Sequence, residues 1–209
     1  LSRADAYQEA RAAGRQAQIE TVSAFLGDVR IDHFIEMTMG GFYTIAQAVA
    51  PITVCLNHDT EDIYSGAYFS AGINQLDASE AMSFVRQRRD MSDGDLELTD
   101  FDRTRRQQAF LVSLANRLKE QDTLTDLNKL NSLISAAKQH MALDDKFELL
   151  SFASVAAELA KGGITFVTLP ITEFAQVDGK SVNLVDVDEI HRIVAELLAP
   201  AAPVTQGED

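Results

Sequence analysis

The feature that most constrains the fold is the alternation of helical and strand patterns along the 209 residues of this chain. In residues 5–26, apolar side chains recur at steps of three and four, which predicts an amphipathic helix. The apolar run at 52–57 follows Pro51 and predicts a buried strand. Because helices and strands interleave throughout, we expect an α/β domain with helices on both faces of a central sheet.

The same patterns give the other elements. We expect strands at residues 30–38, 52–57, 164–170 and 182–186, and helices at 5–26, 40–50, 77–84, 100–121, 124–141, 147–163 and 186–198. Either Asp77 or Ser79 is expected to cap the third helix. Residues 58–75 and 89–99 have the composition of loops. We therefore expect one domain over residues 1–198 and a mobile tail at 199–209.

Charge and cysteine content exclude several classes of protein. The formal net charge is -14, so the summed field repels nucleic acid and anionic membranes. The sequence has no apolar run of transmembrane length and no signal-peptide pattern. It begins at Leu1 rather than at a methionine, and we expect it to be a piece of a larger protein. The single cysteine, Cys55, excludes an internal disulfide, and its apolar neighbours predict a buried residue.

Half of the twelve arginines lie in one short segment of this acidic chain, namely Arg86, Arg88, Arg89, Arg103, Arg105 and Arg106. If the chain is extended after residue 86, Arg86 and Arg88 point to the same side. On a helix that starts near residue 100, Asp100, Arg103 and Gln107 lie one turn apart in succession. The sequence therefore predicts that an acid, an amide and several guanidinium groups share one face near a helix start.

Guanidinium is the side chain best suited to phosphate, because it is planar, always charged and able to bond two oxygens at once. Three or four such groups could hold a pyrophosphate in spite of the acidic surroundings. A second interpretation stays open. The segment also contains six acids, so it could be a solvated stretch that neutralises itself: Asp90, Asp93, Asp95, Glu97, Asp100 and Asp102.

The order of these motifs resembles the LytR-CpsA-Psr family of cell-wall phosphotransferases. The resemblance rests on "RIDHFIEMTMGGFYTIAQAV", on "AYFSAGINQLDASEAMSFVRQR" and on the run "DFDRTRRQQ". It is strongest over residues 5–115, and the pairing of "FVRQR" with "DFDRTRRQQ" is its most specific part. Members are similar to three-layer α/β/α sandwiches with a central mixed sheet, displayed outside the cell on an N-terminal membrane helix.

The resemblance implies a reaction and its residues. Family members transfer a glycopolymer from a polyprenyl-pyrophosphate carrier to peptidoglycan, with a divalent cation that is usually Mg²⁺. Arg86 and Arg88 would hold the pyrophosphate, Asp100, Arg103 and Gln107 would complete the site, and Arg106 would support it. The prenyl tail would need an apolar cavity, which five residues could line unless they only pack the core: Phe34, Ile45, Val49, Phe110 and Leu114.

The chain also departs from the family pattern. The N-terminal strands, with the aspartates that usually hold the metal, have no counterpart, so we expect the metal ligands to lie outside this sequence. Asp102 replaces a common glycine. An alternative is a catalytically silent module that binds polyprenyl phosphate or glycolipid. A nucleic-acid-binding regulator is a third possibility, which the acidic surroundings disfavour.

Overall fold

The computed structural model describes residues 2–92, 98–123, 126–137, 140–146, 148, 151 and 165–199. The chain divides into two compact units. The first consists of Leu1–Asp32 and Val167–Asp209, and the second is His33–Phe166. The expected helix at 147–163 and the tail beyond residue 199 lie outside the described residues. The prediction of a single domain over 1–198 stays a prediction.

The first unit joins the two ends of the chain. Helix α1 (Arg3–Phe25) begins with a capping box between Ser2 and Asp5. Strands β7 (Glu173–Val177) and β8 (Lys180–Leu184) pair antiparallel, and α7 (Val187–Leu198) follows. The two helices agree with expectation. The strand expected at 182–186 begins earlier and pairs with β7, which the pattern did not predict, and residues 165–170 form no strand.

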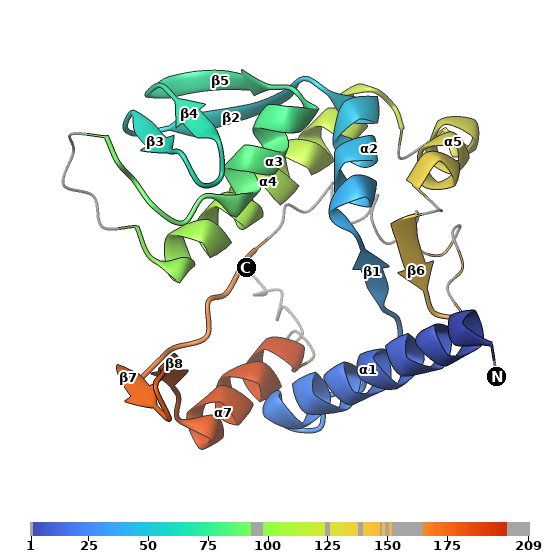
Figure 1. Ribbon diagram of the computed structural model, residues 1–209, viewed down its shortest axis with the longest axis vertical. Helices are drawn as coiled ribbons and strands as arrows, with labels where there is room; N and C mark the ends of the chain where they lie inside the picture. Colours follow the sequence, from blue (N-terminus) through green and yellow to red (C-terminus); the bar gives the residue numbers. More distant parts are fainter. Residues whose placement is uncertain are drawn as a thin grey trace, which may run out of the picture. The chain divides into compact units, whose positions relative to one another are not determined.

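The second unit, which holds the arginine segment, contains the remaining elements (Figure 1). They are β1 (Ile35–Met37), α2 (Met39–Val49), β2 (Ile52–Leu56), β3 (Thr60–Asp62), β4 (Ala67–Phe69), β5 (Gly72–Leu76), α3 (Ala78–Arg86), α4 (Asp100–Glu120), α5 (Leu127–Ala137) and β6 (Met141–Leu143). The observed β1 and α5 are shorter than expected, and Met141 belongs to a strand.

Residues 58–75, which we expected to be a loop, instead hold most of three strands. β3 pairs with β4, and β5 pairs with β2, each antiparallel. The prediction of a loop was wrong because these strands bury polar or small side chains as well as apolar ones. The mixture of helices and strands confirms the α/β class. Within the described residues the strands form four two-stranded sheets, and no central mixed sheet joins them.

The core of the second unit lies where α2, α3 and α4 meet β2 and β5. Phe42 and Phe110 stack with ring centroids 5.1 Å apart, and Phe84 meets Phe69 edge-on at 5.8 Å. Two of the residues considered for a prenyl cavity, Val49 and Phe110, are buried in this core. Ordinary packing therefore accounts for their position.

Helix starts follow the expected local chemistry. Asp77 caps α3, accepting from the N–H groups of Ser79 at 2.7 Å and Glu80 at 2.8 Å, which decides between the two candidates. Thr99 caps α4, and Asp100 and Asp102 lie in its first turn. Acids at this position are stabilised by the helix dipole.

The expectation that Cys55 is buried was wrong. Cys55 is exposed, and its cross-strand partner Ile73 is 76% exposed. Side chains alternate along β2, so Ile52 and Val54 take the inward face and Cys55 takes the outward face. The apolar composition of the run concealed this alternation.

Strand β3 turns polar side chains inward. Asp62 is 2% exposed, and its carboxylate accepts from the N–H groups of Tyr64 at 3.0 Å and Arg88 at 3.3 Å. Burial alone would raise the pKa of this carboxyl. Hydrogen bonds from Ser65, Tyr64 and Arg88 outweigh burial and leave the pKa below its usual value.

Ile52→Ala tests the core. Ile52 is 0% exposed, so we expect the free energy of unfolding to fall by about 2–5 kcal/mol, measured by chemical denaturation. Ile73→Ala, on the paired strand and facing solvent, is the matched control and should change the free energy by only about 0.5 kcal/mol. Equal losses would mean that the two faces of the paired strands β2 and β5 are assigned wrongly.

Asp62→Asn tests the buried carboxylate. Because the folded pKa is lowered, the ionised group stabilises the fold above its unfolded pKa of about 4. That stabilisation is lost as the pH falls through the folded pKa. Denaturation from pH 7 down to pH 2 should show the stability advantage of the wild type over Asp62→Asn shrinking below about pH 4. Parallel loss in both proteins would contradict the assignment; Glu61→Gln is the control.

Candidate functional site

A buried glutamine fixes the chain between α3 and α4. Gln87 is 0% exposed, and its side-chain amide donates to the hydroxyl of Thr60 and to the carbonyl of Arg89, the latter at 2.8 Å. Gln87 is extended and points inward. Its neighbours Arg86 and Arg88 are both exposed. Both arginines are thus exposed, one at the end of α3 and one after it, and their sharing of one side stays a prediction.

The following residues run along the edge of β3. The N–H of Met91 donates to the carbonyl of Glu61 at 2.7 Å, and the carboxylate of Asp90 accepts from the N–H of Glu61 at 3.1 Å. Burial opposes ionisation of Asp90, but hydrogen bonds from Ser92 and Glu61 lower its pKa below the usual value. These hydrogen bonds attach the arginine segment to the folded body. A stretch that was merely solvated would not need them.

One carboxylate oxygen brings two of the predicted arginines together. Oδ1 of Asp100 lies 2.8 Å from an Nη atom of Arg103 and 3.4 Å from Nε of Arg88. The side chains of Arg88 and Arg103 are 60% and 33% exposed. Ion pairs this exposed contribute only about 0–1 kcal/mol, so an incoming phosphate could displace the carboxylate from the guanidiniums.

Arg106 lies three residues beyond Arg103 on α4. Its guanidinium sits over the ring of Phe84, with 5.2 Å to the centroid, and donates to Thr60 at 3.4 Å. Burial lowers the pKa of Arg106, and the charges of Asp90 and Asp102 oppose that shift. An arginine keeps its proton under such conditions, so the group is a fixed positive charge below the surface.

Several buried polar atoms here have no hydrogen-bond partner in the described part of the chain. They include two donors, Nε of Arg103 and an Nη atom of Arg106, and two acceptors, on Gln87 and Asp90. A buried group left unsatisfied costs about 1–3 kcal/mol. The two guanidinium donors would therefore gain from an oxyanion bound beside them.

Gln107 and Arg86 do not contact Asp100 as Arg88 and Arg103 do. The amide of Gln107 donates to the carbonyl of Val85 at 3.2 Å, which ties α4 to the last turn of α3. Arg86 follows directly. Within the described residues, Arg86 makes no ion pair, so its guanidinium is available at the surface. The structure brings Arg88, Asp100 and Arg103 into contact. Arg86 is two residues from Arg88 in the sequence and does not take part in that contact.

The other two arginines of the segment serve local contacts. The guanidinium of Arg89 lies 4.3 Å from the centroid of the Tyr64 ring. Arg105 pairs with Asp102 at 3.2 Å and is 74% exposed. Hydrogen bonds from Thr99, and then the charge of Arg105, lower the pKa of Asp102. These two arginines therefore contact Tyr64 and Asp102 rather than Asp100.

Sequence reasoning missed the residues that support the site, chiefly Gln87, Thr60 and Asp90. One signal was present. If Arg86 and Arg88 share a side of an extended chain, the residue between them must face the other way. A glutamine pointing inward needs a polar partner, and here Thr60 supplies it. Nothing local indicates which strand carries that partner.

The described residues do not fit a metal centre. No three acidic, histidine or cysteine side chains among them gather closely enough to hold a cation, and Asp100 is occupied by two guanidiniums. Within the same residues, none of the helices has the length and apolar character needed to cross a membrane.

The sequence of this chain is similar to those of proteins named for cell wall biosynthesis and teichoic acid transfer. The chain is 38% identical to the cell wall biosynthesis protein LcpA of Corynebacterium glutamicum over 203 residues, covering 96% of this chain and 38% of LcpA. It is 26% identical to the polyisoprenyl-teichoic acid–peptidoglycan teichoic acid transferase TagU of Enterococcus faecalis, covering 88% of this chain and 57% of TagU. The chain thus spans between about two fifths and three fifths of these relatives.

Solved structures show the same fold. The LytR-Csp2A-Psr enzyme from Actinomyces oris superposes with a TM-score of 0.62 at 20% identity, covering 80% of this chain and 64% of that one. The model of the LytR_cpsA_psr family matches residues 4–198. The chain therefore belongs to the LytR-CpsA-Psr family.

Proposed function

We propose that this chain is part of an enzyme that transfers a glycopolymer from a polyprenyl-pyrophosphate carrier to peptidoglycan. The observation that carries the proposal is the pairing of Arg88 and Arg103 on one oxygen of Asp100, beside buried guanidinium donors. The relatives LcpA and TagU, named for cell wall biosynthesis and teichoic acid transfer, support the same reaction class.

The reaction is a phosphoryl transfer. A sugar hydroxyl of peptidoglycan attacks the phosphorus next to the glycopolymer, a new P–O bond forms, and the bond to polyprenyl phosphate breaks. The proton of the hydroxyl leaves with the departing polyprenyl phosphate. Negative charge grows on the phosphoryl oxygens and on the leaving group. Fixed donors aimed at that charge lower the barrier, which is mostly electrostatic and positional catalysis.

Each residue has a role in this scheme. Arg86, Arg88 and Arg103 hold the pyrophosphate, and Arg106, which is half-buried, adds a further positive charge on α4. Gln107 keeps α4 against the end of α3 through Val85. Asp100 holds two guanidiniums in place until phosphate oxygens take over their hydrogen bonds.

The proposal includes Mg²⁺ but assigns it no ligand in this chain. Bound Mg²⁺ would neutralise charge on the pyrophosphate, as the family resemblance implies. Since the described residues do not fit a metal centre, we assign no ligand and derive no step through the ion. We propose that its ligands lie outside this sequence. The site would act at the extracytoplasmic face of a bacterial membrane, anchored by an N-terminal helix that is not among these residues.

One observation favours a second candidate, a catalytically silent module that binds polyprenyl phosphate or glycolipid. The arginines are present, whereas the described residues hold no cluster of metal ligands. Both candidates need the same head-group site. Transfer of a labelled glycopolymer to peptidoglycan distinguishes them, because only the enzyme releases polyprenyl phosphate.

Arg103→Ala tests the head-group site. Hydrogen bonds to charged groups contribute roughly 1.5–3 kcal/mol, so we expect the dissociation constant of geranyl pyrophosphate to rise roughly 10- to 100-fold, measured by calorimetry. Arg89→Ala is the matched control, because that guanidinium contacts Tyr64, and it should change binding by less than about twofold.

Two results of the same titrations would contradict this assignment of the head-group site. Equal losses in Arg103→Ala and Arg89→Ala would mean that binding depends on net charge alone. Unchanged binding in Arg103→Ala would place the pyrophosphate elsewhere. Thermal melting of both variants verifies that they fold.

A further inference from the structure

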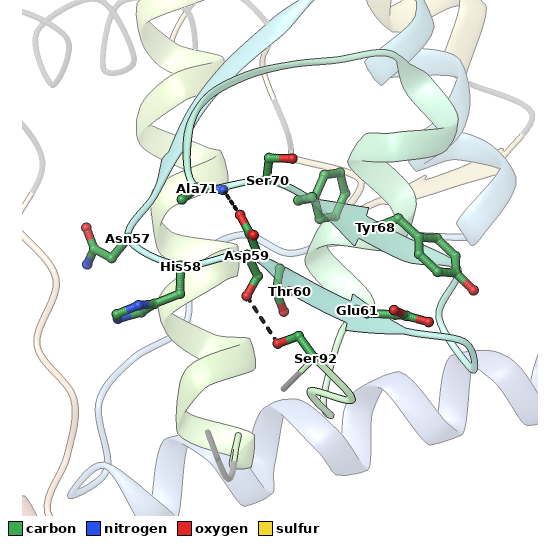
Figure 2. A pocket seen from close by; sticks show the side chains of 10 residues that line it. Asn57, His58, Asp59, Thr60, Glu61, Tyr68, Ser70, Ala71 and Ser92 are labelled. Atoms are coloured by element: carbon green, nitrogen blue, oxygen red, sulfur yellow. Dashed lines mark hydrogen bonds between the residues drawn. The ribbon is translucent and has the colours of Figure 1, made fainter. Parts of the chain in front are cut away.

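A hollow of about 870 Å³ opens beside the β3–β4 hairpin. Ligand pockets commonly have volumes of about 300–1,000 Å³, so it has room for a sugar unit or two. Figure 2 shows Tyr68 and Glu61 together at one end and Asn57 and His58 at the other. The hollow lies wholly within the second unit of the chain.

Hydrogen bonds within the fold hold the shape of this hollow (Figure 2). The carboxylate of Asp59 accepts from the N–H of Ala71 at 2.7 Å, and its carbonyl accepts from the hydroxyl of Ser92 at 3.3 Å. Thr60 is engaged by Gln87 and Arg106. These groups form a frame whose polar atoms already have partners.

The rim has the opposite character. Within the described part of the chain, the side chains of Asn57, His58, Glu61, Tyr68 and Ser70 make no hydrogen bond. Glu61 and Tyr68 are direct cross-strand partners, so their side chains project from the same face. Tyr68 is 59% exposed. A carboxylate and an open aromatic ring side by side can bond sugar hydroxyls and stack against a sugar's C–H face.

Charge decides the class of ligand. Among the described residues, those that line the hollow include the acids Asp59 and Glu61 and no lysine or arginine. A phosphate or polyanion would be repelled from such a surface. The pyrophosphate carrier therefore does not belong here, whereas a neutral saccharide does.

Thr60 links the hollow to the arginines. It lines the hollow, and its hydroxyl accepts from Arg106 at 3.4 Å. The residues that follow Arg88 and Arg89 reach the hollow as well, because Ser92 is part of its lining. Strand β3 therefore both lines the hollow and forms hydrogen bonds with the arginine segment.

We propose that this hollow binds the acceptor, a neutral N-acetylhexosamine sugar of the peptidoglycan glycan. Tyr68 is the stacking platform, and Glu61 accepts from the sugar hydroxyls. The inference rests on the proposed function, in which peptidoglycan supplies the attacking hydroxyl. It divides the two substrates by charge, with the anionic donor at the arginines and the neutral acceptor at the hairpin.

An NMR titration with the soluble β-1,4-linked tetramer of N-acetylglucosamine tests the inference. The amide signals of β3 and β4 should shift in the wild-type chain. Tyr68→Ala should raise the dissociation constant roughly tenfold, and Glu61→Gln should raise it about fivefold. Tyr64→Ala, which removes an exposed tyrosine from the neighbouring turn but not from the hollow, is the control and should bind as the wild type does.

The possible failures are separable. If the wild-type chain does not bind geranyl pyrophosphate, the proposed function is overturned. Absence of tetramer binding, or equal binding by Tyr68→Ala, would overturn this inference alone. A tripeptide Ala-Glu-Lys that shifts the β3 and β4 signals when the tetramer does not would also overturn it, because the acids would then be recognising an ammonium group.

Discussion

The hydrogen bonds from the buried amide of Gln87 to Thr60 and to the carbonyl of Arg89 are the constraint on which the site depends. They hold the chain between α3 and α4 against β3, so that Gln87 faces inward while Arg86, the last residue of α3, and Arg88 are exposed. Without this anchor, flexible arginines would have to be ordered by the ligand, at a cost in conformational entropy. The segment is preorganised by these neutral hydrogen bonds together with the ion pairs of Asp100 with Arg88 and Arg103.

The acidic background and the arginine cluster are compatible because they act over different distances. A net charge of -14 acts over the whole surface and is screened within about 8–10 Å at physiological salt. Contacts between guanidinium and phosphate act at about 3 Å. Asp100 keeps Arg88 and Arg103 close together in spite of their repulsion. The acids at the β3–β4 hollow exclude the same anions, so the charge pattern directs the two proposed substrates to different places.

The sequence was informative where local periodicity decides the structure. The helical spacing of Asp100, Arg103 and Gln107 was predictable, and all three lie on α4. Arg86 and Arg88 are both exposed, but their shared side stays a prediction. Residues 58–75 were not, because their strands are short and Thr60 and Asp62 are buried by hydrogen bonds to distant residues. Cys55 was misjudged because an apolar run does not show which of its members faces solvent. The proposed roles of the arginines in binding stay predictions.

The most direct test of the account is a crystal structure of this chain with geranyl pyrophosphate. The account predicts that the phosphate oxygens lie within hydrogen-bond distance of Arg88 and Arg103, displace the carboxylate of Asp100 and accept from the unpartnered donor of Arg106. Pyrophosphate bound in the β3–β4 hollow, or at any surface away from the start of α4, would contradict it.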